Sequence, residues 1–158
     1  MKTKLIYGLL LMLSFSLMSS TCSSDDDINS NNNAEIIQQI EMLVQSDTWI
    51  ITNYVDSGVD KTNNFSGYSF SFGADNSLTA NSSSNSITGT WSITDSSNSN
   101  DDSYSSEDID FNIYFISPSN FNELSEDWEI VTRTTTKIEL IHLSGGNGGT
   151  DYLTFEKI

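Results

Sequence analysis

The sequence predicts an all-β fold: about eight short antiparallel strands that run up and down and close into a small barrel or pack as a sandwich, preceded by one short helix. Three observations predict it. Several stretches alternate apolar and polar residues with a period of two, as half-buried antiparallel strands do. Turn-forming residues separate these stretches at short intervals. The chain of 158 residues is long enough for one domain and too short for two of ordinary size.

The strands follow from the alternation. It is clearest in three segments, 68–72, 87–93 and 109–115. Weaker alternation predicts five more strands, at 48–55, 77–81, 128–133, 137–143 and 151–157. Gly89 precedes Trp91 by two residues. Because Gly89 has no side chain, neighbouring parts of the chain can approach its backbone closely, so we expect Trp91 on the inward face.

Two connections interrupt the strands. Residues 95–107 are rich in Ser, Asn and Asp, and we expect them to form a long exposed loop. Residues 118–126 include Phe121 and Leu124, which predicts one helical turn at the rim of the barrel.

A helix is predicted over residues 34–45, with Asn33 as its N-cap. Its apolar residues recur at helical spacing: Ile36, Ile37, Ile40, Leu43 and Val44. We expect it to cover one end of the domain. A partner-binding or membrane-surface helix is the alternative, and the absence of Lys and Arg from its polar face speaks against the membrane version.

The N-terminus has the layout of a secretory signal peptide over residues 1–21. Lys2 and Lys4 precede an apolar run at 5–18, and small residues follow at 19–21. The run is shorter than the roughly 20 residues that span a bilayer. An uncleaved transmembrane anchor is the alternative.

Cys22, directly after these small residues, resembles the cysteine of a bacterial lipobox, which is lipidated after cleavage before it. The acidic cluster Asp25–Asp27 resembles the surface-export signal of lipoproteins from Bacteroidota-type bacteria. The resemblance implies a lipid-attached Cys22. Residues 23–33 have Ile28 as their lone apolar residue and cannot bury enough surface to order themselves, so we expect a flexible acidic tether over 22–33, followed by a domain at 34–158. The resemblance also implies a membrane partner through the lipid and a place at the outer membrane, exposed at the cell surface. An unmodified cysteine and a plain acidic linker are the alternatives.

Composition excludes several functions. Without Lys2 and Lys4, four scattered bases face 22 acidic residues, so nucleic acid binding and docking on anionic lipid by a basic patch are excluded. One His excludes multi-His metal sites, and one Cys excludes internal disulfides and CxxC redox chemistry. We expect no cofactor, no metal and no catalytic residues. We also expect the protein to be a monomer.

The strand motifs resemble the bacterial lipocalin-like lipoproteins. The residues that carry the resemblance are Trp49, the strand 67–72, Gly89-Thr90-Trp91, the segment 121–128 and the strand 152–157. The resemblance implies a small antiparallel barrel with an apolar interior, without implying a particular ligand.

Several polar residues are candidate sites. His142 could be a general base or metal ligand, although a single strand His is more often simply hydrogen-bonded. Two groups of carboxylates, Asp108 with Asp110 and Glu126 with Asp127, could form a glycosidase-type pair, although such neighbouring carboxylates are usually solvated. The loop at 101–102 could bind calcium, but the EF-hand spacing is not met.

The aromatic residues on the strands are the main candidates for a binding site. We predict a ligand-binding site at Tyr68, Phe70, Phe72, Trp91 and Phe115. A barrel of this size either holds a cavity or fills with side chains. The predicted function is a lipid-anchored, non-catalytic module that binds a small apolar or amphipathic ligand. A carbohydrate-binding or adhesive surface protein is the alternative, and a hydrolase is the least favoured hypothesis.

Overall fold

The computed structural model describes residues 28–96, 109–144 and 149–158, with the side chains of the first helix described from Asn33 onward. Its elements, in chain order, are α1 (Ile28–Gln45), β1 (Thr48–Asp56), β2 (Val59–Asp60), the 3-10 helix η1 (Thr62–Phe65), β3 (Ser69–Phe72), β4 (Ser77–Asn81), β5 (Ser86–Asp95), β6 (Ile109–Tyr114), α2 (Ser119–Asn122), β7 (Asp127–Arg133), β8 (Lys137–Leu143) and β9 (Thr150–Lys157).

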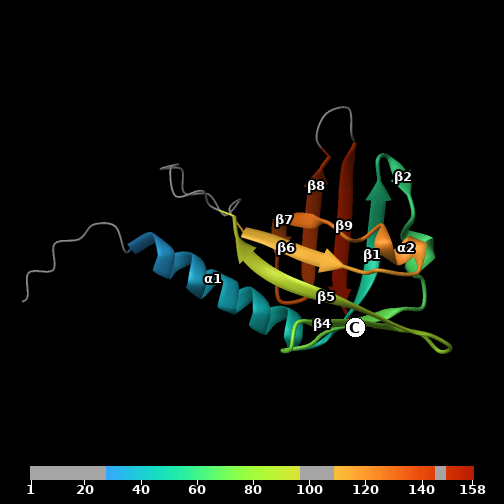
Figure 1. The fold of residues 1–158 in the computed structure, drawn as a ribbon, viewed down its shortest axis with the longest axis horizontal. Coiled ribbons are helices and arrows are strands. Elements are labelled where there is room, and N and C mark those ends of the chain that lie inside the picture. The colour runs from blue at the N-terminus through green and yellow to red at the C-terminus, as the bar shows by residue number, and fades with distance from the viewer. Residues whose placement is uncertain (1–27, 97–108, 145–148) are drawn as a thin grey trace, which may run out of the picture.

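The strands form an antiparallel meander that closes on itself (Figure 1). Each strand from β3 to β9 pairs with the next, and β1 pairs with both β3 and β9. These eight strands make the barrel, and the two-residue β2 pairs with the end of β1. The predicted up-and-down barrel is therefore confirmed. Pairing of the first strand with the last is how such barrels avoid open edges.

Burial follows the predicted alternation. In β3, Phe70 and Phe72 are buried while Ser69 and Ser71 are half-buried. Two register shifts interrupt the regular pairing, one in β1 between Ile51 and Asn53 and one in β7 between Ile130 and Thr132. Such bulges bend a strand and redirect the side chains beside them.

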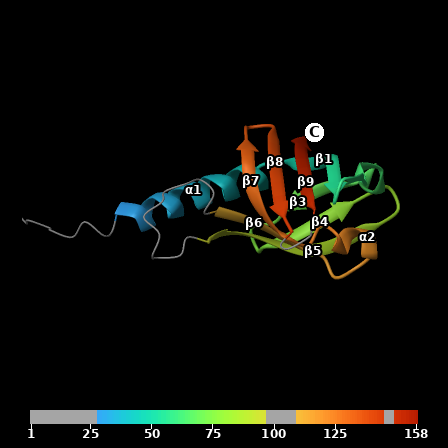
Figure 2. The same cartoon turned by 90° about the horizontal axis from the view of Figure 1, so that it is seen from above.

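The barrel has two differently covered ends (Figures 1 and 2). At the α1 end, where β1, β6 and β8 begin, α1 packs against β3 and β5. At the α2 end, where β1, β6 and β8 finish, η1 and α2 lie, and a ring of η1 contacts one of α2. The helical turn predicted for residues 118–126 is confirmed as α2.

Helix α1 is longer than predicted. It begins at Ile28 rather than Ala34, so residues 28–33, which we expected in the tether, are helical. Asn33 lies inside the helix instead of capping it. Its Nδ2 donates a hydrogen bond to Asp95 Oδ2 over 3.0 Å, a tertiary contact that local propensity does not reveal. No helix in the described part of the chain has both the length and the apolar character needed to cross a membrane.

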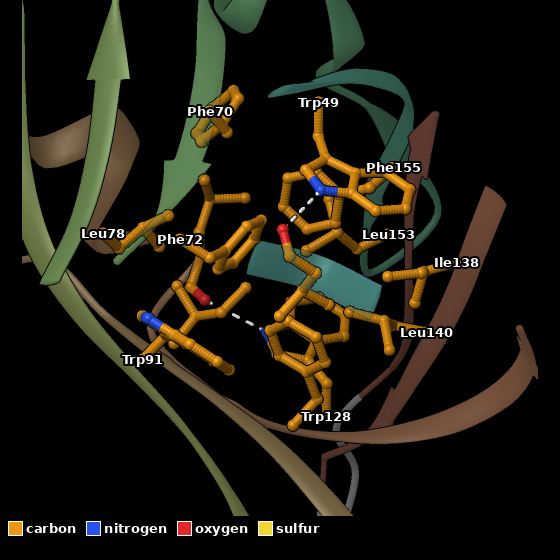
Figure 3. Close-up of a cluster of buried hydrophobic side chains, with 14 of the residues drawn as sticks. Trp49, Phe70, Phe72, Leu78, Trp91, Trp128, Ile138, Leu140, Leu153 and Phe155 are labelled. Carbon is orange, nitrogen blue, oxygen red and sulfur yellow. Dashed lines mark hydrogen bonds between the residues drawn. The ribbon is translucent and has the colours of Figure 1, made fainter. Parts of the chain in front are cut away.

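Side chains from all around the barrel meet in one apolar core (Figure 3). Trp91 is 3% exposed, which confirms its predicted inward position. Gly89 is required beside it, because a Cβ there would lie 2.6 Å from Phe115 Cδ1. Close packing of side chains in the core therefore stabilises the barrel in addition to strand pairing.

Candidate functional site

The structure brings the five predicted ligand-binding residues together. Phe70, Phe72, Trp91 and Phe115 are all less than 5% exposed, and Tyr68 is half-buried. Phe121 of α2 connects three of them, since its ring centroid lies 5.0 Å from Tyr68, 6.2 Å from Phe70 and 5.2 Å from Phe115. Phe72 contacts Trp91 edge-on at 5.4 Å.

These contacts fill the centre of the barrel with rings in tilted and edge-to-face arrangements, which aromatic pairs prefer. Phe155 of β9, which the predicted site did not include, adds contacts to Phe70 and Phe72 at 5.5 and 5.6 Å. A ligand at this position would have to displace a packed ring. The binding role of the five residues stays a prediction.

An apolar pocket lies at the α1 end. It has a volume of about 140 Å³ and is lined by residues of α1, β6 and β7: Ile36, Ile40, Ile109, Ile130, Val131, Thr132 and Arg133. Val131, at the register shift of β7, is 60% exposed. The helical periodicity of the sequence predicted that Ile36 and Ile40 face the domain, where they line this pocket. The bulge that places Val131 beside them has no signal in the sequence.

A polar depression of about 330 Å³ lies over β5 and β6. Its lining includes Thr90, Ser92, Thr94 and Asn112, and Tyr114 beside them is 54% exposed. Asn112 Nδ2 donates a hydrogen bond to Thr94 Oγ1 over 2.8 Å. Hydroxyl and amide groups next to an exposed ring resemble the surfaces on which sugars stack.

A third group of polar residues gathers around His142 at the α2 end. His142 Nε2 lies 3.6 Å from Glu126 Oε2 and 3.6 Å from Asp127 Oδ1. Its Nδ1 lies 3.5 Å from Asp151 Oδ2. Asp151 is buried, and its Oδ1 accepts a 2.7 Å hydrogen bond from the Ser57 backbone N–H.

Two of the carboxylates expected to be solvated, Glu126 and Asp127, differ in environment. The side chain of Asp127 is 68% exposed, in line with that expectation, while that of Glu126 is 38% exposed. Burial raises the pKa of Glu126 above its usual value, and His142 opposes this shift. Sequence reasoning had no means to separate these neighbours, because their difference comes from the elements packed over them.

Lys61 and Tyr54 lie nearby at the same end. Lys61 Nζ pairs with Asp56 Oδ2 at 2.5 Å and with Glu123 Oε2 at 3.1 Å. The Tyr54 hydroxyl donates a 2.7 Å hydrogen bond to the Glu123 backbone oxygen. Burial raises the Tyr54 pKa well above its usual value of 10.0, and the charges of Asp56 and Glu123 raise it further.

Several predicted features lie wholly or mostly outside the described residues: the signal peptide at 1–21, the lipidated Cys22, the acidic cluster Asp25–Asp27, and the exposed loop at 95–107 with its candidate calcium site at 101–102. The structure leaves these predictions as they stand.

Comparison with known proteins gives one structural similarity. No protein-family model and no curated protein matches the chain. The crystal structure of a DUF4847 family protein from Bacteroides vulgatus is similar, with 18% identity, a TM-score of 0.44, and coverage of 74% of this chain and 96% of that one. Likeness at this level says nothing about function.

Proposed function

We propose that the protein is a lipid-anchored lipoprotein of the outer membrane, exposed at the cell surface, whose barrel is a non-catalytic module that binds a small apolar or amphipathic ligand. The observation that carries the ligand proposal is the apolar pocket between α1 and the β6–β7 side of the barrel.

The chemistry of the pocket favours an apolar group. Its walls are mainly aliphatic, and Ile40 and Ile109 are each 2% exposed, so their side chains form a fixed apolar surface. Burial of apolar ligand area on such a surface contributes roughly 25 cal/mol per Å². Arg133 in the lining offers a guanidinium group to the polar end of an amphipathic molecule.

The size of the pocket limits what it can hold. At about 140 Å³ it is smaller than the roughly 300–1,000 Å³ of drug-sized ligand sites. It therefore accommodates a short alkyl chain or one end of a longer molecule, with the rest lying over the exposed Val131.

The anchoring proposal is supported by the N-terminal sequence: the charged and apolar leader, Cys22 after small residues, and the acidic cluster behind it. Lipid chains hold a protein at a membrane without any contribution from protein charge, at roughly 0.8 kcal/mol per buried methylene. This suits a chain with a formal net charge of −16.

The ligand proposal is tested by titrating the purified protein with N-phenyl-1-naphthylamine, a neutral apolar fluorophore, and following its emission. We expect saturable binding that Val131→Glu weakens about tenfold, or about 1.4 kcal/mol. Val59→Glu is the matched control, because Val59 is 58% exposed on β2 at the opposite end. We expect it to leave binding unchanged.

Two other outcomes would change the proposal. If Phe70→Leu weakens binding and Val131→Glu does not, the ligand binds in the barrel interior, as the sequence predicted. An absence of saturable binding by the folded protein would reject the ligand-binding function.

The alternative function, binding of a carbohydrate at the cell surface, is favoured by the polar depression beside Tyr114. It predicts retention on immobilised polysaccharide that Tyr114→Ala abolishes. Tyr152→Ala is the control, since Tyr152 is 46% exposed and lies on β9 outside this depression. Equal retention of both variants would exclude the depression as a sugar site.

A further inference from the structure

His142, Glu126 and Asp127 bring three potential metal ligands together at the α2 end of the barrel. Glu126 precedes β7, Asp127 begins it, and His142 comes from the adjacent β8. Their ligand atoms all lie within 4.8 Å of one another. The site is far from the apolar pocket along the barrel, since that pocket is built from the other ends of β6 and β7.

The spacing of the donor atoms fits a tetrahedral metal ion. Ligand nitrogens and oxygens about 2.0–2.2 Å from a Zn²⁺ ion are about 3.4 Å from one another in tetrahedral geometry. His142 Nε2 lies 3.6 Å from Glu126 Oε2 and from Asp127 Oδ1. Both separations are close to the value expected around a tetrahedral ion. They leave room for an ion between the three atoms.

The position of Asp151 orients the imidazole for metal binding. Asp151 Oδ2 faces His142 Nδ1, and Asp151 is itself held by the Ser57 N–H. A proton on Nδ1 then points to Asp151 and turns the Nε2 lone pair toward Glu126 and Asp127. Metal-bound histidines have this arrangement, in which a carboxylate accepts the N–H of the nitrogen that does not bind the metal.

The local negative charge also favours a cation at this position. With Nδ1 protonated, Nε2 and two carboxylate oxygens converge as three acceptors without a donor between them. Asp151 adds a further carboxylate behind the ring, and the side chain of His142 is only 18% exposed, so solvent screens these charges incompletely. A divalent cation at the centre would compensate them.

We propose that Glu126, Asp127 and His142 form a binding site for one divalent transition metal ion, best fitted by Zn²⁺, with Asp151 as the residue that positions His142. The imidazole favours Zn²⁺ over Ca²⁺ and Mg²⁺, which prefer oxygen ligands. Three protein ligands leave the fourth tetrahedral position open to water or to a group of a bound molecule. The ion would join β8 to the connection between α2 and β7.

The test is calorimetric titration of the untagged, purified full chain with Zn²⁺ at pH 7, in a buffer that does not chelate metals. We expect one Zn²⁺ per chain, with Ca²⁺ binding much more weakly. Co²⁺ in place of Zn²⁺ should give the visible absorption of a tetrahedral nitrogen- and oxygen-ligated ion. Thermal unfolding of each variant checks that it is folded.

Glu126→Gln and Glu123→Gln form a matched pair, because both side chains are 38% exposed at the same barrel end while Glu123 pairs with Lys61 instead. We expect Glu126→Gln and His142→Gln to weaken Zn²⁺ binding and Glu123→Gln to leave it unchanged. Asp151→Asn should weaken it about 10–100-fold, as loss of a partner behind a metal-bound histidine does.

Two results would overturn the proposal. If the folded protein binds no Zn²⁺ saturably, Glu126, Asp127 and His142 do not form a metal site. If Zn²⁺ binds but folded His142→Gln binds it equally well, the ion sits on other acidic groups of the chain.

Discussion

At the scale of single residues, the three tryptophans connect the barrel to the segments around it. Each indole N–H donates to a backbone oxygen outside its own strand: Trp49 to Val44 at 2.9 Å, Trp91 to Gly73 at 3.0 Å and Trp128 to Leu124 at 3.1 Å. A buried indole needs such a partner, since an unsatisfied N–H costs roughly 1–3 kcal/mol. Each ring therefore fills the core and also holds a helix or turn in place.

Trp91→Ala tests this dual role. We expect it to lower the free energy of unfolding by about 3–5 kcal/mol, because it leaves a cavity in the core and removes the hydrogen bond to Gly73. Trp91→Phe, which keeps a ring, should cost less. Denaturant unfolding followed by circular dichroism measures both. A loss below about 1 kcal/mol for Trp91→Ala would contradict the buried position.

Tyr54 gives a prediction for alkaline pH. Its folded-state pKa lies above the usual 10.0, so the unfolded chain releases the phenol proton first as the pH rises. The stability linked to this proton is thus fully present below pH 10.0 and is lost progressively above it.

We expect Tyr54→Phe to cost about 1 kcal/mol at pH 7, through loss of the hydrogen bond to Glu123, and to unfold with a shallower pH dependence above pH 10. Unfolding of both proteins from pH 7 to 11 measures this. An unchanged slope in the variant would show that Tyr54 is not the titrating group. Tyr152→Phe, at an exposed ring, is the control.

At the scale of elements, α1 belongs to the barrel even though it precedes it in sequence. Val44, near the end of α1, is fully buried. Lys157 of β9 contacts the ring of Trp49, with its Nζ 5.1 Å from the ring centroid. Lys157 Nζ also donates to Ser46 Oγ over 2.9 Å. The end of the last strand therefore helps hold the connection between helix and first strand.

Ile40→Ala tests how firmly α1 is docked. Ile40 is 2% exposed, and we expect its truncation to cost about 2–5 kcal/mol and to weaken fluorophore binding at the apolar pocket. Met42→Ala on the same helix is the control, since Met42 is 58% exposed and should change stability by less than about 0.5 kcal/mol. Equal effects of the two variants would mean that α1 does not pack as described.

At the scale of the whole molecule, the two barrel ends differ in chemistry. The α1 end offers aliphatic side chains, and the α2 end gathers Asp56, Glu123, Glu126, Asp127 and Asp151 around Lys61 and His142. The closed core between them is apolar. The two sites that we propose therefore lie at opposite ends of the barrel and can be tested independently.

Cys22→Ser tests the anchor. Without a thiol no lipid can be attached, so we expect the protein to move from the membrane to the soluble fraction of the cells that make it. Replacement of Asp25–Asp27 by Ala should leave it in the membrane but protect it from added protease. A Cys22→Ser protein that still sediments with membranes would favour an uncleaved N-terminal anchor.

The sequence alone determined the strands, their inward faces and the all-β class, with a barrel or a sandwich as the two possible arrangements. In a strand the side chains alternate between two faces, so apolar residues such as Phe70, Trp91 and Ile138 identify the core side without knowledge of the partner strand. The amphipathic face of α1 was predictable for the same reason, since Ile40 and Val44 share a helical stripe.

Only the tertiary structure decided how the ends of the barrel are built. Closure by β1 and β9 and the register shift at Val131 depend on contacts between distant segments. The same holds for the meeting of His142 with Glu126, Asp127 and Asp151, which come from different parts of the chain. Local propensity and periodicity carry no information about such pairings, because their energy arises only once the strands have closed around a common core.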